Sequence, residues 1–279
     1  MHPVTTRTLE TTRSGLLAGI AALEPLAPPA IVLESAEGAD IRAVEAAVLA
    51  AGRPVLAVIG GTLDSGGASD DPLIDAPGPA GDRALASLAR TRSALSSLGC
   101  VTLIAPIGDG GVPPRLPGAD GALADHEAWA AEHRSAREAG ADRLCRRLFA
   151  FARAEPMVRV LLLTSDDPGA LLDAEVTGWV LGEVPENVGL ACDTGILGLR
   201  ASRGDGPIDG WLAEHGGRVA LSLVSDHDGA GRSDLLIGTG VLDREILREG
   251  FGRAVPRAIR PDPLLPSALV AEATRALDL

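Results

Sequence analysis

Eight short runs rich in Val, Ile and Leu alternate with longer segments rich in Ala, Leu, Arg and Glu along this chain. Runs of this kind are typical of parallel strands buried on both faces, and the longer segments have the residue pattern of helices. Strands that alternate with helices pair in parallel, because each helix returns the chain to the same end of the sheet. The sequence therefore predicts an α/β protein, and eight such units close a (β/α)8 TIM barrel.

The predicted strands cover residues 4–9, 30–34, 54–59, 100–106, 158–164, 188–193, 218–224 and 257–260. The predicted helices cover residues 15–26, 41–51, 82–98, 126–154, 168–182, 208–214, 243–250 and 266–277. Asp40 is expected to cap the second helix, and Gly52 and Gly99 follow helix ends, where glycine is favoured. A chain of 279 residues fits one barrel, so residues 1–279 are predicted to form a single TIM-barrel domain.

Composition excludes several chemistries. The chain carries 25 basic and 38 acidic residues, a formal charge of −13, and no run of Arg forms a basic stripe, so nucleic acid is not expected as a partner. The chain contains neither Lys nor Tyr, which excludes a Schiff-base lysine, a phosphate-loop lysine and a tyrosine-dependent reductase. The GDGG segment at 108–111 precedes Pro113 and Pro114 instead of a helix, so it does not predict a dinucleotide site.

The spacing of the cysteines and the composition of the N-terminal residues favour a cytoplasmic location. Cys100, Cys145 and Cys192 are too widely spaced for a CxxC pair, and three thiols leave one over in any disulfide scheme. The N-terminal residues lack the apolar core of a signal peptide, and no segment reaches the roughly 18 apolar residues of a membrane span. A cytoplasmic protein without membrane contact is expected, and the sequence leaves open a monomer or a homodimer formed through the outer helices.

Two stretches in the second half of the chain carry the most specific pattern. VGLACDTGIL, at 188–197, ends a predicted strand in Asp-Thr-Gly, and GGRVALSLVSDHDG, at 216–229, ends the next strand in Ser-Asp-His-Asp. IGTGVLDREIL, at 237–247, adds a Gly-rich turn and an acidic helix start. In this order they resemble the xylose isomerase-like barrel superfamily of sugar-phosphate isomerases and epimerases, inositol-catabolic dehydratases and isomerases, and endonuclease IV-type repair enzymes. The resemblance implies a TIM barrel over nearly the whole chain.

The resemblance also implies a divalent cation, held by Glu at the end of strand five, Asp at the end of strand six, His in strand seven and Glu in strand eight. At these positions this chain has Leu163 or Thr164, Asp193, Leu221 or Leu223, and Arg260. One carboxylate among Leu and Arg side chains does not replace most of the hydration shell of a hard divalent ion. Neither the family metal nor any other cofactor is therefore predicted.

Polar residues at the predicted strand ends are the candidates for chemistry. The predicted catalytic residues are His227, Asp193, Asp226, Asp228 and Arg260: His227 transfers a proton, Asp226 or Asp228 orients it, Asp193 holds a substrate hydroxyl or acts as a second base, and Arg260 stabilises negative charge. The predicted substrate-binding residues are Glu34, Asp64, Asp109, Ser165 and Asp166.

These assignments predict a protein that resembles sugar phosphate isomerases and epimerases and acts on a small polar carbonyl or polyhydroxy ligand by acid/base proton transfer. One alternative is a non-catalytic barrel that binds a ligand or a partner after losing its metal site. Another is a rearranged metal site built from Glu34, Asp64, Asp193 and Asp228. The Asp and His residues of SDHDG are also good turn formers, and Asp193 is also a potential helix cap.

Other features carry weaker signals. The Gly-, Pro- and Asp-rich loops at 60–81 and 108–125 follow strands and are candidate lids over the barrel end. His126 and His133 are seven residues apart and are expected to be exposed helix polarity, and the RGD tripeptide at 203–205 is expected to be an ordinary loop.

Overall fold

The computed structural model of the chain describes residues 4–5, 28–33, 41–60, 74–117, 122–251, 254–260, 269–270 and 272. Outside these residues lie the predicted helix at 15–26, the cap by Asp40, most of the loop at 60–81, and the predicted substrate-binding residues Glu34 and Asp64. Of the predicted helix at 266–277, residues 269, 270 and 272 are described, and they are helical.

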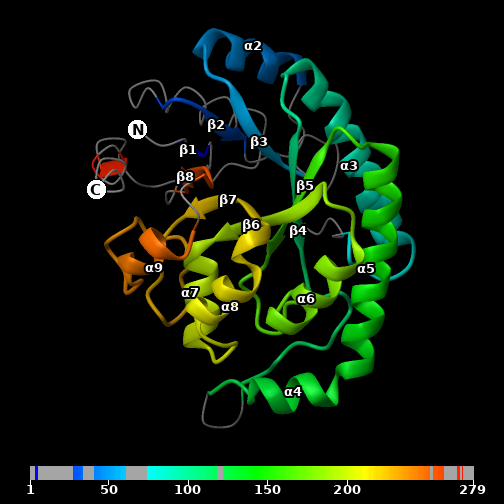
Figure 1. Ribbon diagram of the computed structural model, residues 1–279, viewed down its shortest axis with the longest axis vertical. Coiled ribbons are helices and arrows are strands. Elements are labelled where there is room, and N and C mark those ends of the chain that lie inside the picture. The colour runs from blue at the N-terminus through cyan, green and yellow to red at the C-terminus, as the bar shows by residue number, and fades with distance from the viewer. Residues whose placement is uncertain are drawn as a thin grey trace.

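Eight parallel strands form a closed barrel (Figure 1). They are β1 (Val4–Thr5), β2 (Ile31–Leu33), β3 (Val55–Ile59), β4 (Thr102–Ile107), β5 (Arg159–Thr164), β6 (Val188–Asp193), β7 (Val219–Val224) and β8 (Arg257–Ile259). Each strand pairs with the next, and β8 closes the barrel on β1 through the pair Val4↔Ile259. All eight predicted strand ranges overlap an observed strand, so the (β/α)8 barrel is confirmed.

Helices cover the outside of the barrel (Figure 1). They are α2 (Ile41–Ala51), α3 (Pro79–Ser97), α4 (His126–Glu132), α5 (Arg134–Ala154), α6 (Ala174–Glu183), α7 (Thr194–Ser202), α8 (Ile208–His215) and α9 (Arg244–Glu249), and a 3-10 turn (Gly216–Arg218) precedes β7. Contacts run from α3 to α5, from α5 to α6 and from α6 to α8, so these helices form a continuous part of the outer layer. Gly52 and Gly99 follow helix ends with φ of 62° and 70°, as predicted.

The barrel wall separates two hydrophobic cores, because alternate residues of each strand point to opposite faces. In the described part of the chain, the inner core is made of strand residues; its buried members are Val32, Ala57, Ile59, Ile104, Leu161, Leu163, Ala191, Leu221, Leu223 and Ala258. The outer core joins the other face of the strands to helix residues such as Leu88, Leu144 and Val176. The barrel interior is thus filled with apolar side chains as far as Leu163 and Leu223, and Asp193 of β6 pairs with Leu223 in register.

Two helices differ from the prediction. The predicted helix at 126–154 is broken at His133 (φ −102°, ψ 15°) into α4 and α5. Helix α7 was not predicted, because its nine residues are almost all buried and include two glycines, which leaves no amphipathic pattern. It begins directly after β6, with Asp193 as its N-cap.

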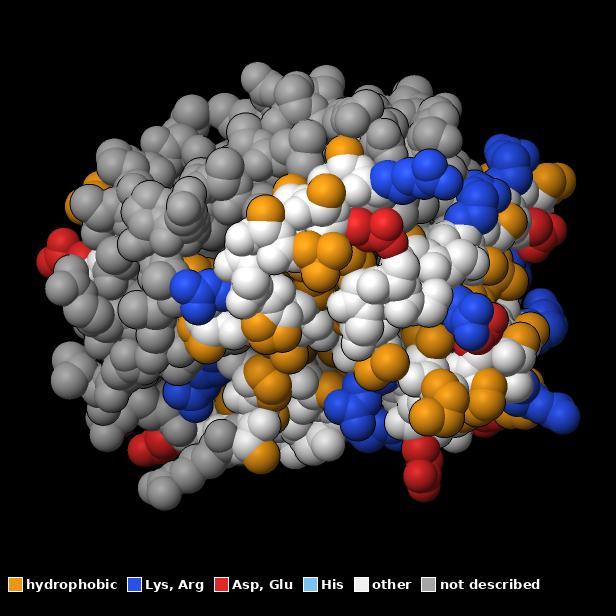
Figure 2. Space-filling model, turned by 90° about the horizontal axis from the view of Figure 1, so that it is seen from above, with side chains coloured by type: hydrophobic (Ala, Val, Ile, Leu, Met, Phe, Trp, Pro, Cys, Tyr) orange, Lys and Arg blue, Asp and Glu red, His pale blue; other side chains and the backbone are white. Residues whose placement is uncertain are grey.

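The described part of the surface mixes side chains of all kinds. In the view of Figure 2, Arg side chains are dispersed among hydrophobic and acidic ones. The helices in the described part of the chain include none that combines the length and apolar character needed to cross a bilayer.

Candidate functional site

The side chains of Asp193, Ser225 and Arg260 meet at the carboxyl end of the barrel, and we call them the mouth cluster. Asp193 ends β6, and Ser225 and Arg260 directly follow β7 and β8, which are the next two strands around the barrel. Arg260 Nη1 donates to Asp193 Oδ2 at 2.8 Å, and Ser225 Oγ donates to Asp193 Oδ1 at 2.6 Å. The Asp193 side chain is 0% exposed and that of Arg260 is 18% exposed. The mouth cluster therefore contains a largely buried ion pair that spans the ends of β6 and β8.

This arrangement does not fit the divalent cation that the family resemblance implies. Leu163 and Leu223 point into the barrel core at two of the expected ligand positions, and the guanidinium of Arg260 occupies a third. The remaining ligand, Asp193, already binds that guanidinium. Among the residues that the structure describes, no group of three His, Cys, Asp or Glu side chains is placed to hold a metal ion. The positive charge beside Asp193 is thus supplied by an arginine of the chain itself.

The Asp-Thr-Gly motif joins β6 to β7 in what we call the β6–β7 clasp, formed by Thr194, Gly195 and Ser225. Thr194 Oγ1 donates to the carbonyl of Ser225 at 2.6 Å and accepts the Ser225 N–H at 3.1 Å. Gly195 leaves no room for a side chain, because a Cβ there would lie 2.1 Å from the Ser233 carbonyl oxygen and 2.5 Å from Ser225 Oγ. The motif therefore fixes two adjacent strand ends relative to each other.

Asp226 organises the loop that follows β7. Its Oδ1 accepts the backbone N–H groups of His227 at 2.8 Å and Leu242 at 2.9 Å, and its Oδ2 accepts those of Gly238 at 2.9 Å and Gly240 at 3.0 Å. Four backbone donors on one buried carboxylate hold the Gly-rich turn against the strand end. Its predicted catalytic role stays a prediction, and its observed contacts are those of a loop-forming residue.

His227 packs against α7. It is 5% exposed, and a Cβ on Gly198 would lie 2.2 Å and 2.3 Å from its Cδ2 and Nε2 atoms. Its Nδ1 accepts the Gly229 N–H at 3.2 Å, a bond that places the proton on Nε2 in the neutral ring. Burial lowers the pKa of His227, although the charges of Asp226 and Asp228 oppose this, so the ring is neutral near pH 7. The predicted proton transfer requires the ring to leave its contact with Gly198.

Asp228 forms an exposed turn. Its Oδ1 accepts the backbone N–H groups of Ala230 and Gly231 at 2.8 Å and of Arg232 at 3.0 Å. These bonds lower the pKa of Asp228 to about 2, and the bond from the Gly231 N–H contributes most. The contacts of Asp228 are those of a turn former, and the hydrogen bond at the His227 ring comes from Gly229 rather than from a carboxylate.

The described substrate-binding candidates lie in the loops after β4 and β5. Asp109 is exposed and accepts the Gly111 N–H at 2.7 Å. Ser165 Oγ donates to Asp167 at 2.6 Å, and Asp166 Oδ2 accepts the hydroxyl of Ser233 at 2.8 Å. Asp166 therefore links the loop after β5 to the loop after β7, and the assignment of all three residues to substrate binding stays a prediction.

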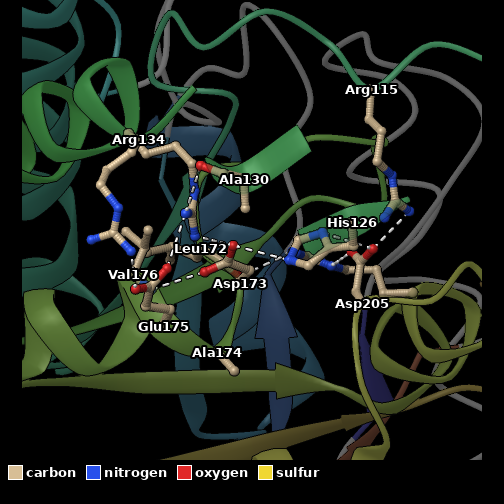
Figure 3. A network of polar contacts seen from close by, with 12 residues as sticks. Arg115, His126, Ala130, Arg134, Leu172, Asp173, Ala174, Glu175, Val176 and Asp205 are labelled. Atoms are coloured by element: carbon tan, nitrogen blue, oxygen red, sulfur yellow. Dashed lines mark hydrogen bonds and ion pairs between the residues drawn. The ribbon is translucent and has the colours of Figure 1, made fainter. Parts of the chain in front are cut away.

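A second polar cluster lies outside the barrel, and sequence reasoning missed it (Figure 3). We call it the rim network; its members are Arg115, His126, Arg137, Asp173, Arg200 and Asp205. The ring of His126 lies between two carboxylates, with Nε2 at 3.3 Å from Asp173 Oδ2 and Nδ1 at 3.5 Å from Asp205 Oδ1. The expectation that His126 is exposed helix polarity is therefore wrong, since its side chain is only 18% exposed.

Buried arginines neutralise both carboxylates of the rim network. Arg137 binds Asp173, and Asp205 accepts Arg200 Nε at 2.8 Å and lies 2.7 Å from Arg115 Nη2. Burial raises the pKa of Asp173, but the contacts with His126, the Val176 N–H and Arg137 outweigh burial and lower it. The RGD tripeptide thus supplies a buried acid that ties the turn after α7 to the segment after β4.

Solved structures are similar to the chain over nearly its whole length, whereas sequence comparisons find no match. No family model matches the chain, and no curated protein sequence matches it. Among solved structures, the chain is similar to 3-keto-D-glucoside 4-epimerase from E. coli, with a TM-score of 0.68, 16% identity, and coverage of 100% of this chain and 99% of the other. It is also similar to D-allulose 3-epimerase from Methylomonas sp., solved with D-allulose, with a TM-score of 0.66, 14% identity, and coverage of 99% and 96%.

A third similar structure has a different activity. It is an AP endonuclease of family 2 from Brucella melitensis, with a TM-score of 0.67, 13% identity, and coverage of 99% and 98%. Identities this low show the fold alone, and the same fold carries both epimerases and an endonuclease. The protein therefore has the xylose isomerase-like TIM-barrel fold that its Asp-Thr-Gly and Ser-Asp-His-Asp segments predicted.

Proposed function

We propose that the protein binds a small polar carbonyl or polyhydroxy compound at the barrel mouth and isomerises or epimerises it by proton transfer, without a divalent metal. The observation that carries this proposal is the ion pair between Arg260 and Asp193, at 2.8 Å. When a proton leaves the carbon next to a carbonyl group, negative charge develops on the carbonyl oxygen. A guanidinium held in place stabilises that charge as a fixed donor.

The roles of the residues follow from their contacts. Arg260 binds the substrate oxygen, and Asp193, itself held by Ser225, positions Arg260. His227 is the proton-transfer group, and its low pKa keeps it in the neutral form that accepts a proton. It reaches the substrate by moving off Gly198 together with the loop after β7.

The names of similar solved structures and the net charge of the chain support a sugar-like substrate. Two of the similar structures are a 3-keto-D-glucoside epimerase and a D-allulose epimerase, both of which act on sugars according to their names. A nuclease activity, as in the third similar structure, is disfavoured because the chain carries a formal charge of −13. We therefore propose an enzyme of small-molecule metabolism, and we expect neither nucleic acid nor a membrane as its partner.

Deuterium exchange tests this proposal whatever the product is, because the signal comes from the proton that is removed. The protein is incubated in D2O with aldoses, ketoses and their phosphates, and NMR follows deuterium entry at the carbon next to the carbonyl. Exchange should persist after treatment with EDTA, and Arg260→Gln should lower it by about 100-fold or more. Arg257→Gln is the matched control, because Arg257 begins the same strand but lies on its outer face, and it should leave the exchange rate unchanged.

Two results would overturn parts of the proposal. Exchange that EDTA abolishes and Mn²⁺ restores would refute the metal-free reaction, and full exchange by Arg260→Gln would refute the role of Arg260.

A non-catalytic binding barrel is the second candidate function. It is favoured by the contacts of Asp226, Asp228 and His227, whose polar atoms are engaged by the backbone of their own loop. Saturable binding of a sugar in calorimetry, with no exchange of its protons and with loss of binding in Arg260→Gln, would establish this function instead.

A further inference from the structure

The loop after β7 contains a short segment that lies along helix α7, and we call this segment, residues 227–233, the strap. Its two end residues, His227 and Ser233, are 5% and 8% exposed, whereas the residues between them are largely exposed. Just outside the strap, Asp226 and Leu235 exchange two backbone hydrogen bonds, at 2.8 Å and 3.0 Å. The strap is therefore the tip of a closed hairpin, and it can hinge at this pair of bonds.

Two glycines of α7 let the strap approach the helix closely. Gly195 and Gly198 are three residues apart, so they lie on the same face of α7. A Cβ on Gly195 would lie 2.1 Å from the Ser233 carbonyl oxygen. A Cβ on Gly198 would lie 2.2 Å from His227 Cδ2. The strap thus covers this face of α7 and holds the imidazole of His227 against it.

Ser233 fastens its end of the strap on two sides. Its hydroxyl donates to Asp166 Oδ2 at 2.8 Å, and its carbonyl accepts Ser225 Oγ at 3.0 Å. Ser225 also contacts Asp193 in the mouth cluster, at 2.6 Å. Asp166 is itself held in place, because Arg203 Nη1 donates to its backbone carbonyl at 2.5 Å. One residue of the strap therefore contacts both the loop after β5 and the mouth cluster.

A polyhydroxy compound can replace the bond between Ser233 and Asp166. A sugar hydroxyl donates to a carboxylate as a serine hydroxyl does, so Asp166 keeps a donor when the sugar takes the place of Ser233. The freed Ser233 hydroxyl can bind water instead. A ligand that binds Asp166 only after this bond opens shifts the strap toward its open position.

We propose that the strap opens when a substrate hydroxyl displaces Ser233 from Asp166, and that Ser233 is a positioning residue that couples substrate binding to the release of His227. This inference rests on the proposed function, since it makes the substrate responsible for moving His227 off Gly198. The strap keeps the proton-transfer group covered until a polyhydroxy ligand reaches the barrel mouth.

The other end of the strap keeps a contact of its own. The Val241 N–H donates to the His227 carbonyl at 2.9 Å, and this bond does not involve Ser233. Loss of the contact between Ser233 and Asp166 should therefore raise the population of the open strap without releasing it completely.

Chemical modification of His227 measures the opening of the strap without any substrate. Diethyl pyrocarbonate acylates neutral imidazole, and the ring of His227 is neutral near pH 7. Ser233→Ala and Asp166→Ala should each raise the modification rate at His227 by about ten-fold, measured by peptide mass mapping. The double variant should react no faster than either single variant, because both substitutions remove the same bond.

Three controls separate opening of the strap from other effects. Asp167→Ala removes the neighbouring carboxylate, which accepts the Ser165 hydroxyl, and should leave the rate at His227 unchanged. Ser233→Thr keeps the hydroxyl and should stay within about two-fold of the unmodified protein. The side chain of His215 is 4% exposed and lies 2.9 Å from the Ala174 carbonyl, so it reports loosening of the whole protein, and its rate should not change.

The deuterium-exchange assay tests the part played by the substrate. In Ser233→Ala the open strap is already populated, so the KM of the sugar should fall by about three- to ten-fold. In Asp166→Ala the strap opens, but the substrate loses a charged acceptor, so KM should rise by about ten-fold. A merely structural loosening would shift KM in the same direction in both variants.

Three outcomes would overturn the proposal. They are an unchanged rate at His227 in Ser233→Ala, a parallel rise at His215, and KM values that shift in the same direction in the two variants. Absence of exchange with every sugar would instead refute the proposed reaction, and with it opening by substrate. The modification rates at His227 would still decide whether Ser233 fastens the strap.

Discussion

Replacing Arg260 with Leu tests how strongly the mouth cluster is held together. The substitution leaves the buried carboxylate of Asp193 without its cation, and breaking one partner of a buried pair costs about 3–5 kcal/mol. Two features reduce this cost. Asp193 keeps three donors, which are the Ser225 hydroxyl at 2.6 Å and the N–H groups of Gly195 at 3.0 Å and Ile196 at 3.2 Å. Arg260 is also partly solvated, so we expect Arg260→Leu to lower the free energy of unfolding by about 2–3 kcal/mol.

A double-mutant cycle isolates the interaction between the two side chains. Asp193→Asn removes the charge but keeps an oxygen that can cap α7, so the double variant Asp193→Asn/Arg260→Leu no longer contains an unpaired buried charge. It should be more stable than the sum of the single effects implies, with a coupling free energy of about 1–2 kcal/mol. Unfolding in urea, followed by circular dichroism at pH 7, measures each term. Arg257→Leu serves as a control for loss of an arginine from the same strand.

A coupling free energy below about 0.3 kcal/mol would mean that the two groups do not sense each other. An equal loss of stability in Arg260→Leu and Arg257→Leu would show that the effect is one of side-chain packing rather than of charge pairing.

Four further predictions concern other contacts. Gly198→Ala should destabilise the protein by about 1–3 kcal/mol through its clash with His227, and adding His227→Ala should recover most of that loss in urea unfolding. The pKa of His227 in the folded protein lies below 6.5, so the unfolded protein takes up a proton at this ring first as the pH falls. The free energy of unfolding should therefore decrease below about pH 6.5. Thermal unfolding between about pH 5 and 8 should show a smaller decrease for His227→Gln than for the unmodified protein. Asp75→Asn weakens the acceptor of two backbone N–H groups after β4 and should speed amide hydrogen exchange there, with little change within β4 itself. Arg137→Met leaves Asp173 without its guanidinium and should cost about 3 kcal/mol or more in urea unfolding, and a cost below about 1 kcal/mol would contradict the buried ion pair.

The strands were predictable because a buried strand requires a short apolar run, which is visible in the sequence. A strand covered on both faces needs a nearly continuous apolar run, and VLLLT in β5 and VALSLV in β7 supply one. Helix α7 has no comparable signal, since a nearly all-buried helix with two glycines has neither a polar face nor high helix propensity. The break at His133 was missed because the residues on either side of it continue a helical composition.

The mouth cluster was predictable in part. Parallel strand ends gather at one end of a barrel, so placing Asp193 and Arg260 there required only the strand assignments. Ser225 was missed because a serine after a strand is indistinguishable from a turn residue. The rim network was missed for a different reason, which is distance along the chain. Arg137 and Asp173 are 36 residues apart, and Arg115 also donates to the backbone carbonyl of Arg203, 88 residues away. Which face of a surface helix becomes covered depends on the packing of its neighbours, and local patterns do not contain that information.

The β6–β7 clasp works through Thr194, Gly195 and backbone atoms, and it leaves the inward-facing positions 163, 221 and 223 without a part in that junction. The side chains at those positions can therefore be replaced without removing any contact of the clasp, whereas Thr194 and Gly195 cannot. A protein engineer who installed acidic or imidazole side chains there, and removed the arginine opposite, would be working on a frame whose strand ends are already locked in register. The chain is in this sense a ready scaffold for testing how much of a metalloenzyme resides in its ligands and how much in the barrel that presents them.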